Sequence, residues 1–235
     1  MVAQLEKTTT SEIIYPDSDG KQMADNTLQF RWITTIKSNL DWLFADNPQV
    51  FVAGDLLWYP VEGDNKKRVA PDVMVVFGRE KGERGSYHQW KEDNISPQVV
   101  FEILSPGNTT KEMYGKLLFY QGYGVEEYYI YDPNLNDLTG FVRQDNILTI
   151  IEEIDGWKSP RLGIRFQLSQ SELTIYYPND ESKGTGDRFS TYNEEKQKVL
   201  AEKERAEKEK ERAEKEKQRA DKLEAKLREL GIDLP

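Results

Sequence analysis

The sequence predicts an α+β fold, in which a mixed β-sheet is flanked by helices and followed by a long charged helix. Three observations support this prediction. Apolar residues first repeat with helical period, then gather in short runs typical of strands, and a second helical segment separates two groups of these runs. Helices and strands that alternate in this way along the chain are typical of the α+β class.

The first helix is predicted over residues 27–44. Its apolar residues recur three or four positions apart, as on the buried side of an amphipathic helix: Phe30, Ile33, Ile36, Leu40. Asp25 and Asn26 are both suited to cap its first turn, because a short polar side chain can accept a hydrogen bond from a free N–H group there.

The strands are predicted from apolar runs bounded by turn residues. They fall at about 49–59, 73–77 and 98–104 and, after the second helix, near 126–132, 138–143, 147–153 and 163–168. The polar connection 78–97 has little regular pattern. Long loops beside a site often recognise the substrate, so Tyr87, His88 and Trp90 are candidates for substrate contact, although an ordinary loop role fits His88 at least as well.

The second helix is predicted to begin after Thr109, because Thr109 and Glu112 have the spacing of a capping box. Gly122 and Gly124 supply its end. Its apolar stripe consists of Met113, Leu117 and Tyr120. Lys116 falls between these residues in angle, so its ammonium is directed at whatever the stripe covers.

Two carboxylates accompany the apolar runs that precede this helix. In VVFEILS (99–105), alternation places Glu102 on one face with Val100, and Phe101 on the other, although both faces are apolar. A lone buried carboxylate is costly unless it is paired, protonated or bound to a metal. Asp72 opens a similar run, PDVMVVF. If the second helix packs on this sheet, Asp72, Glu102 and Lys116 converge.

These residues resemble the PD-(D/E)XK nuclease superfamily, which has the restriction-endonuclease-like fold, and more closely the Uma-two family within it. The matching stretches are APDVMVVF and PQVVFEILSPGNTTKEMYGKLLFYQGYGVEEYYIYDP. The second is the specific one: a strand ending in E-x-L-S-P, an acidic residue seven positions after the serine, a lysine four further on, and a G-V-x-E-Y strand entry.

The chain departs from the superfamily pattern at three positions. Leu104 stands where the superfamily has its lysine, and Lys116 on the following helix takes its place, as in many Uma-two proteins. Glu112 stands where many relatives have Asp, although capping is its favoured role. Leu28 stands near a position where relatives often have His.

The resemblance implies a metal-dependent endonuclease that hydrolyses phosphodiester bonds of nucleic acid, with DNA the expected substrate. Asp72, Glu102 and the backbone carbonyl of Ile103 would bind Mg²⁺ or Mn²⁺, since hard cations favour oxygen ligands. Lys116 would orient the attacking water or stabilise negative charge. Asp55 is either a third carboxylate or a turn residue after Gly54, and Ser105 is expected to turn or cap the chain before the following proline.

Two other classes of function stay open. One is a binding module that keeps the nuclease fold without cleaving, in which Glu102 and Lys116 form only a buried ion pair. The other is an oligomerising scaffold built on the C-terminal helix. The net-acidic body favours the first, because nonspecific binding to a polyanion draws on lysine and arginine. Two clusters are either a basic rim or solvated loops: Lys66, Lys67 and Arg68, and Arg79, Lys81 and Arg84.

Composition suggests the following organisation. Residues 1–22 are expected to be flexible, 23–180 to form the nuclease-like domain, 181–192 to be a linker and 193–231 to form the charged helix. The chain has no cysteine and no apolar stretch of membrane-spanning length, which fits a cytoplasmic protein without a membrane partner. The 13 basic and 12 acidic residues of 193–231 nearly cancel, whereas residues 1–192, with 19 basic and 29 acidic residues, carry a net charge of −10.

The charged helix has two interpretations. Every seventh position carries a small or apolar residue, and two leucines extend this seam only at its end: Val199, Ala206, Ala213, Ala220 and Leu227, then Leu223 and Leu230. A coiled coil of this kind would make a homodimer. Glu-to-Lys pairs at four-residue spacing, such as Glu204–Lys208 and Glu211–Lys215, equally support a single solvated helix.

Overall fold

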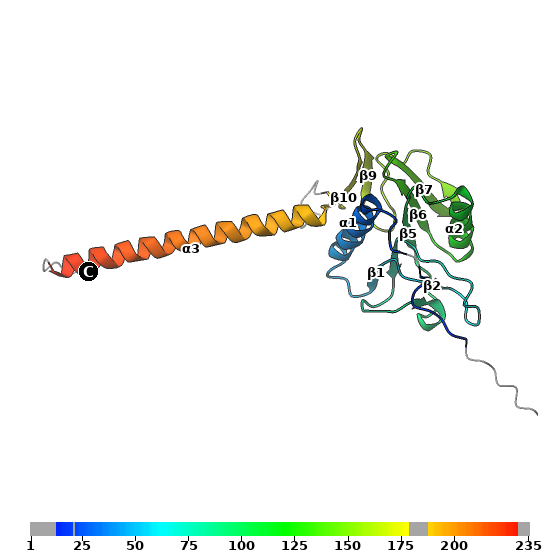
Figure 1. Ribbon diagram of the computed structural model, residues 1–235, viewed down its shortest axis with the longest axis horizontal. Helices are drawn as coiled ribbons and strands as arrows, with labels where there is room; N and C mark the ends of the chain where they lie inside the picture. The colour runs from blue at the N-terminus through cyan, green and yellow to red at the C-terminus, as the bar shows by residue number, and fades with distance from the viewer. Residues whose placement is uncertain (1–12, 21, 179–187, 230–235) are drawn as a thin grey trace, which may run out of the picture. The chain divides into compact units, whose positions relative to one another are not determined.

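The computed structural model describes residues 13–20, 22–178 and 188–229 (Figure 1). The chain divides into two units, Met1–Phe189 and Ser190–Pro235, and each is described by itself. Residues 1–12 and 21 of the predicted flexible segment, and 181–187 of the predicted linker, lie outside the described residues. Within the first segment, the backbone carbonyl of Pro16 accepts a hydrogen bond from the Tyr59 hydroxyl at 2.7 Å.

The elements of the first unit follow the predicted order. The helices are α1 (Thr27–Leu43), the 3₁₀ helix η1 (Gln89–Lys91) and α2 (Thr110–Gly122). The strands are β1 (Val50–Gly54), β2 (Trp58–Tyr59), β3 (Val73–Phe77), β4 (Tyr87–His88), β5 (Val99–Ile103), β6 (Glu127–Asp132), β7 (Asp137–Gln144), β8 (Ile147–Ile150), β9 (Arg165–Leu168) and β10 (Leu173–Tyr176).

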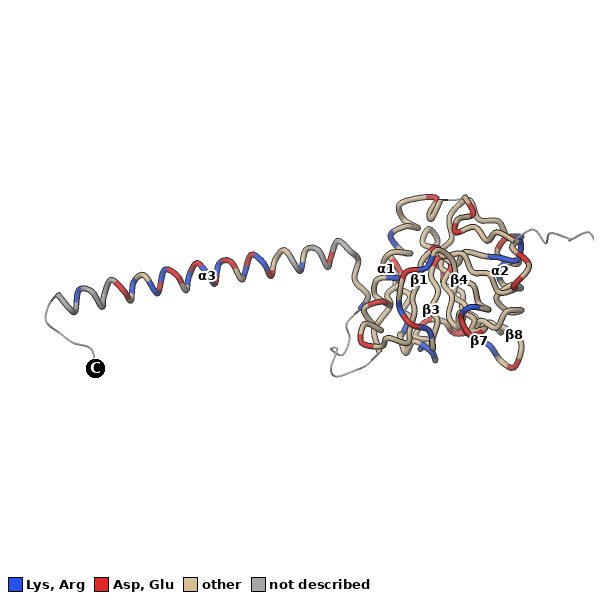
Figure 2. The backbone as a smooth tube through the Cα atoms, turned by 90° about the horizontal axis from the view of Figure 1, so that it is seen from below, with Lys and Arg blue, Asp and Glu red and all other residues tan. Residues whose placement is uncertain are grey.

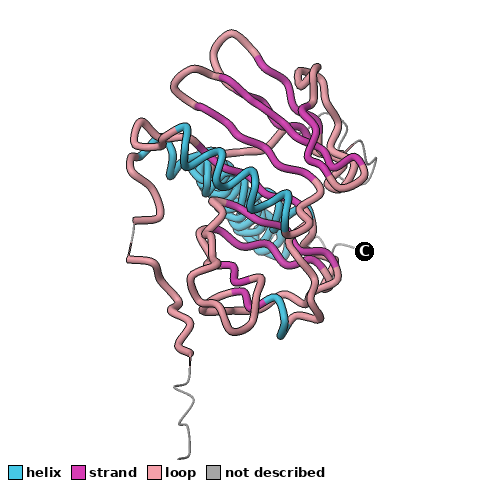
Figure 3. Tube along the Cα trace, turned by 90° about the vertical axis from the view of Figure 1, so that its right-hand side faces the viewer, coloured by secondary structure: helices cyan, strands magenta, loops and turns pink. Residues whose placement is uncertain are grey.

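A six-stranded mixed sheet forms the centre of this unit, with the strand order β1-β3-β5-β6-β7-β8. Its neighbouring strands are antiparallel except for β5 and β6, which run parallel and are connected through α2. Helices α1 and α2 lie on opposite faces of the sheet (Figures 1 and 3). The predicted α+β class, with a mixed sheet flanked by helices, is confirmed.

Each face of the sheet has its own hydrophobic core. On the α1 side, Ile33 and Ile36 pack with Phe101 of β5. On the α2 side, Tyr120 packs with Val100 of β5. Consecutive residues of β5 therefore enter different cores, as the alternation in VVFEILS predicts.

Two predictions about the first helix are refined by the structure. Asn26 is the N-cap, since its side-chain oxygen accepts a hydrogen bond from the Gln29 N–H at 2.9 Å. Phe30, predicted to be buried, is 49% exposed, whereas Gln29 beside it is buried. The buried stripe thus begins at Gln29 and continues through Ile33 and Ile36.

The single strand predicted over 49–59 is wrong, because the chain leaves the sheet at Asp55. This residue has a left-handed backbone conformation, with φ +49°, which aspartate tolerates better than most residues. Its N–H group donates to the carbonyls of Pro71 and Asp72, at 3.1 and 3.2 Å. The chain continues as β2, which pairs with β4 in a separate two-stranded sheet.

The connection between β3 and β5 is organised around Glu92. This carboxylate accepts hydrogen bonds from Nε of Arg79 at 2.8 Å and from Nε of Arg84 at 2.7 Å. Both guanidinium groups are therefore held by Glu92, and whether this cluster forms a basic rim stays a prediction. Tyr87 is fully buried and donates to the Ile95 carbonyl, so its predicted contact with substrate is wrong.

The aromatic residues that follow Tyr87 pack against the N-terminal segment. The rings of His88 and Trp90 stack with their centroids 4.9 Å apart, and Tyr15 lies 5.0 Å from Trp90 and 5.1 Å from His88. These contacts fix the edge of the unit beside β2. They favour a packing role for His88 and Trp90.

The second unit consists of the helix α3 (Tyr192–Glu229). Acidic and basic residues alternate along it, as Figure 2 shows. One predicted pair is present, with Lys215 Nζ 4.0 Å from Glu211 Oε2. The seam side chains of Val199, Leu223 and Leu227, and the whole of Leu230, lie outside the described residues, so the coiled coil and the single helix both stay predictions. Among the helices described, none combines the length and apolar character needed to cross a membrane.

Gly140 in β7 offers a test of the core on the α1 side. A Cβ at this position would lie 2.6 Å from Cδ1 of Ile154 and 2.8 Å from Cδ1 of Ile151. We expect Gly140→Ala to lower the free energy of unfolding by about 1–3 kcal/mol, the usual cost of overpacking. Gly115→Ala in α2, whose Cβ would meet nothing within 4 Å, should raise it by about 0.5–1 kcal/mol. Urea unfolding curves measure both, and equal effects would contradict this account of the core.

Candidate active site

The pairing of β3 with β5 places the two predicted carboxylates opposite one another. Val73 pairs with Phe101 and Met74 with Val100, so Asp72 and Glu102 are the next residues in this register. Opposite residues of an antiparallel pair project to the same face. Both side chains are buried, with Glu102 2% and Asp72 9% exposed.

Asp72 is held by the backbone of the neighbouring strand. Its Oδ2 accepts a hydrogen bond from the Ile103 N–H at 2.6 Å. Burial raises the pKa of Asp72 well above its usual value, and the charge of Glu102 raises it further, while Lys116 and the Ile103 hydrogen bond oppose the rise. The charge of Glu102 thus lies close enough to disfavour the ionisation of Asp72.

Glu102 receives its hydrogen-bond donors from α2. Lys116 Nζ lies 2.6 Å from Glu102 Oε2, and the Tyr120 hydroxyl donates to Glu102 Oε1. Lys116 and Tyr120 are four residues apart, so one helical turn brings both to the same carboxylate. Burial by itself would lower the pKa of Lys116, but the negative charges of Glu102 and Asp72 and the Glu102 hydrogen bond outweigh it, and the pKa is raised. Asp72, Glu102 and Lys116 therefore converge as the sequence suggests.

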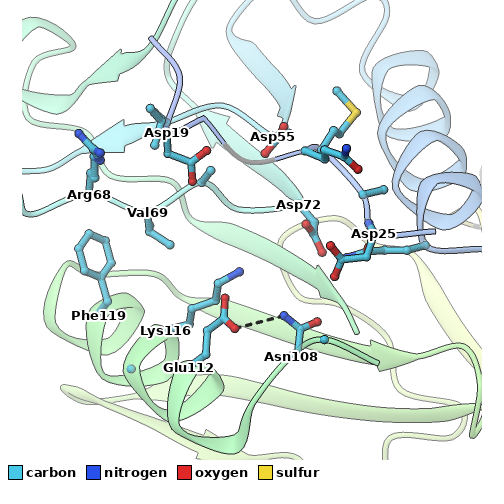
Figure 4. Close-up of a pocket in the computed structure, with 18 residues that line it drawn as sticks. Asp19, Asp25, Asp55, Arg68, Val69, Asp72, Asn108, Glu112, Lys116 and Phe119 are labelled. Atoms are coloured by element: carbon cyan, nitrogen blue, oxygen red, sulfur yellow. Dashed lines mark hydrogen bonds between the residues drawn. The ribbon is translucent and has the colours of Figure 1, made fainter. Parts of the chain in front are cut away.

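A pocket of about 870 Å³ opens over these residues (Figure 4). Asp72 and Lys116 line it, and Glu102 is connected to it through its hydrogen bond with Lys116. Charged and apolar side chains from the N-terminal segment, the β1–β3 connection and α2 complete the wall: Asp19, Met23, Asp25, Asp55, Leu57, Arg68, Val69, Glu112 and Phe119. Most charged side chains of the pocket are thus acidic, with Lys116 and Arg68 as the basic side chains in its described lining.

Two residues of the wall, Asp55 and Glu112, each had two alternative predicted roles. Burial raises the pKa of Asp55, and the charge of Asp19 raises it further. Glu112 follows the capping residue Thr109, whose hydroxyl accepts a hydrogen bond from the Glu112 N–H at 3.2 Å, so the predicted cap is present. The Glu112 carboxylate lies 3.5 Å from Nδ2 of Asn108 and lines the pocket (Figure 4).

Gln29 lines the pocket but was not among the predicted site residues. Its Nε2 donates to the Ile103 carbonyl at 2.8 Å, the oxygen predicted as a metal ligand. A carbonyl oxygen has two lone pairs, so this contact leaves one acceptor site. The helical pattern could have predicted that Gln29 is buried, because it stands four residues before Ile33, in phase with the buried stripe of α1.

The turn after β5 is held by Ser105, as expected for a residue before proline. The Ser105 N–H donates to Oδ1 of Asn108 at 2.8 Å, and its hydroxyl donates to the Asp25 carboxylate. These contacts connect the start of α1 with the start of α2. These hydrogen bonds therefore stabilise the pocket wall where the two helices begin.

The donor set is compatible with a divalent cation. Asp72 and Glu102 supply two carboxylates beside the single ammonium of Lys116, and oxygen ligands of this kind suit Mg²⁺ or Mn²⁺. Among the described residues, no three acidic or histidine side chains form a ready-made metal cluster. A cation here would depend on two carboxylates and a backbone oxygen, with water and substrate completing its shell, which is how Mg²⁺ is commonly bound.

The mixed sheet, its two carboxylates and the helical lysine define a protein of the restriction-endonuclease-like class. Residues 22–171 match the family described as "Uma2: Putative restriction endonuclease", and the chain belongs to that family. A solved structure described as "a putative nuclease belonging to DUF820", from Anabaena variabilis ATCC 29413, is 16% identical, with a TM-score of 0.45 over 59% of this chain and 75% of that one. The search of curated proteins gave no match.

The raised pKa of Asp72 predicts how stability depends on pH in the ion-free protein. The folded state holds the Asp72 proton more tightly than the unfolded chain, so stability should fall as pH rises from about 4 through the folded-state pKa. Asp72→Asn keeps an acceptor for the Ile103 N–H but removes the charge. We expect it to raise the free energy of unfolding at pH 7 by on the order of 1 kcal/mol.

The gain from Asp72→Asn should shrink as the pH is lowered towards 4, because the wild-type carboxyl group is then protonated. Thermal unfolding in the presence of a chelator, at a series of pH values, measures this difference. Asp145→Asn, in the exposed turn after β7, is the matched control and should change stability at neither end of the range. A loss of stability in Asp72→Asn at pH 7 would contradict the account.

Proposed function

We propose that this protein is a metal-dependent endonuclease that hydrolyses phosphodiester bonds of DNA. The observation that carries the proposal is the meeting of Asp72, Glu102 and Lys116 at one pocket. Membership of the Uma2 family supports nuclease chemistry. The metal, the DNA substrate and the residue roles below belong to the proposal.

Asp72 and Glu102, with the Ile103 carbonyl, would hold Mg²⁺ or Mn²⁺. Two facing carboxylates in a buried site repel each other, and a divalent cation relieves that repulsion while it satisfies their remaining lone pairs. When bound, such an ion polarises the phosphodiester and lowers the pKa of a coordinated water.

Lys116 acts as a cation and not as a base in this proposal. Its raised pKa keeps it protonated across the physiological range. The side chain is 17% exposed and lines the pocket, so the ammonium is available to a phosphate while it remains paired with Glu102. A fixed positive charge of this kind stabilises the extra negative charge that develops on phosphate in the transition state.

The substrate approaches a pocket whose charge is unfavourable to a polyanion. Asp19, Asp25 and Glu112 line it, whereas Arg68 is the basic group in the described lining besides Lys116. Affinity for nucleic acid would therefore depend strongly on the bound cation, and Arg68 is placed to contact a phosphate next to the scissile one. Ion binding and substrate binding should be coupled.

A second candidate is a nuclease-fold module without catalytic activity. The observation that favours it is that both oxygens of Glu102 already accept hydrogen bonds from α2. A buried carboxylate with an ammonium and a hydroxyl as partners is satisfied without any ion. The two candidates differ in whether the site binds a divalent cation, and the two experiments below separate them.

Glu102→Gln should abolish cation binding and cleavage together. We expect the rate on supercoiled and single-stranded DNA with Mg²⁺ or Mn²⁺ to fall by about 100-fold or more, because an amide is a much weaker ligand than a carboxylate. Gel-based cleavage assays, with chelator-treated samples as blanks, measure the rate. The same assay on a single-stranded RNA of matching sequence identifies the nucleic acid that is cut.

The matched control for Glu102→Gln is Glu127→Gln. Glu127 is also a buried carboxylate of the central sheet, but it lies on the face of the sheet away from Asp72 and is bound by Ser159, Tyr129 and the Arg161 N–H. Folded Glu127→Gln should keep full cleavage activity. Equal activity of the unaltered protein and Glu102→Gln would reject the proposed site.

Lys116→Met separates the catalytic role of the lysine from cation binding. Removing the ammonium leaves the Glu102 charge free for the ion, so we expect Mg²⁺ affinity to stay the same or rise, while cleavage falls by about 10²–10³-fold. Isothermal titration calorimetry and the cleavage assay measure the two effects on the same sample. Loss of ion binding together with cleavage would show that Lys116 supports the fold of the site and not the chemistry.

A further inference from the structure

Helix α2 supplies two different donors to one carboxylate. Lys116 donates to Oε2 of Glu102, and the Tyr120 hydroxyl donates to Oε1. Tyr120 is fully buried and does not line the pocket, so it cannot contact substrate. Any contribution it makes to the site has to act through Glu102.

We propose that Tyr120 is a positioning residue, whose hydroxyl fixes the Glu102 carboxylate in the orientation that a divalent cation requires. This inference rests on the proposed function. The terminal torsion of a glutamate is broad, so a carboxylate held at one oxygen can still rotate. Donors at both oxygens fix its plane, and each oxygen keeps a lone pair for an ion.

The chemistry of a phenol suits this position. Burial raises the pKa of the Tyr120 hydroxyl well above its usual value, and the charge of Glu102 raises it further, so it remains a neutral donor. A second ammonium would orient the carboxylate equally well, but it would cancel the negative charge that attracts a cation. Tyrosine therefore provides orientation without weakening the charge of the site.

The ring of Tyr120 is itself held by its neighbours. The Trp58 ring is parallel to it at a centroid distance of 6.3 Å, and the Tyr128 ring meets it edge-on at 4.9 Å. Because the ring is enclosed by aromatic side chains, its hydroxyl has a defined place. Groups that orient a metal ligand in this way commonly affect metal affinity by 10- to 100-fold when they are lost.

Tyr128 provides a matched control. It is fully buried, it lies against Tyr120, and its hydroxyl makes no hydrogen bond to any described residue. Tyr128→Phe and Tyr120→Phe each delete one buried phenolic oxygen from the same aromatic cluster. Only Tyr120→Phe removes a hydrogen bond to Glu102.

The experiment is calorimetric titration of Mn²⁺ into the full chain, without nucleic acid, for the unaltered protein and both variants. We expect the Kd of Tyr120→Phe to rise by about 10- to 100-fold. Tyr128→Phe should stay within about twofold, because a hydroxyl without a partner orients nothing. Circular dichroism melting curves verify that each variant is folded. Saturating Mn²⁺ should restore the cleavage activity of Tyr120→Phe, which a merely unfolded protein would not show.

A spectroscopic readout on the unaltered protein needs no variant. An ion on Glu102 withdraws charge from the oxygen that accepts the Tyr120 hydrogen bond, so saturating Mg²⁺ should change the near-ultraviolet tyrosine absorbance. The change should follow the calorimetric binding curve, persist in Tyr128→Phe and disappear in Tyr120→Phe. A near-ultraviolet absorbance spectrum that does not change at saturating Mg²⁺ would overturn the inference.

The remaining outcomes separate this inference from the function on which it rests. If the unaltered protein binds Mn²⁺ and Tyr120→Phe binds it equally well, the positioning role is wrong and the proposed nuclease stands. If both variants lose affinity to the same extent, the effect is one of aromatic packing and the positioning role is again wrong. If the unaltered protein binds no ion, the proposed function fails, and the inference fails with it.

Discussion

The buried carboxylate of Glu102 is the constraint on which the arrangement of the site depends. A side chain that is 2% exposed cannot be solvated by water, so its charge has to be met by donors from the protein. Those donors come from α2, through Lys116 and Tyr120, and not from the sheet that carries Glu102. The carboxylate therefore fixes the rotation of α2 about its axis and its position along β5. A small change in either would leave a charge unpaired, which costs more than a loss of apolar contact.

The same buried carboxylates make the folded protein less stable than apolar residues at their positions would. Apolar residues at positions 72 and 102 would extend the core on the α2 side, whereas the two carboxylates repel each other and raise the pKa of Asp72. Proteins keep such unfavourable groups mainly where they serve a function. The hydrogen bonds at Ile103 hold this arrangement in place: its N–H is bound by Asp72 and its carbonyl by Gln29.

Local patterns in the sequence predicted the parts of the site that depend on local geometry. Alternation in VVFEILS predicted that Glu102 and Phe101 lie on opposite faces of the sheet. Helical spacing predicted that Lys116 lies on the side of α2 that faces the sheet. The convergence of Asp72, Glu102 and Lys116 followed from these patterns, but other contacts between distant residues were not predicted. Tyr120 was assigned to an apolar stripe, and its hydroxyl gave no sign of its partner. Arg79 and Arg84 seemed to be free cations, because Glu92 becomes their partner only when the connection folds back. A turn at Asp55 was one of its two predicted roles, but the strand was predicted to continue to residue 59 because apolar residues lie on both sides of Asp55.

Comparison with Glu127 shows which features of Glu102 indicate a site. Both are buried carboxylates on neighbouring parallel strands of one sheet. Glu127 packs on the other face, where the Ser159 and Tyr129 hydroxyls and the Arg161 N–H satisfy it, and burial raises its pKa despite these hydrogen bonds. The Ser159 and Arg161 donors anchor the loop that follows β8. Glu102 differs in having a second carboxylate opposite it, an ammonium beside it and a pocket in front of it. Burial of a carboxylate is thus common to a structural anchor and a candidate metal ligand, and the neighbouring charges distinguish the two.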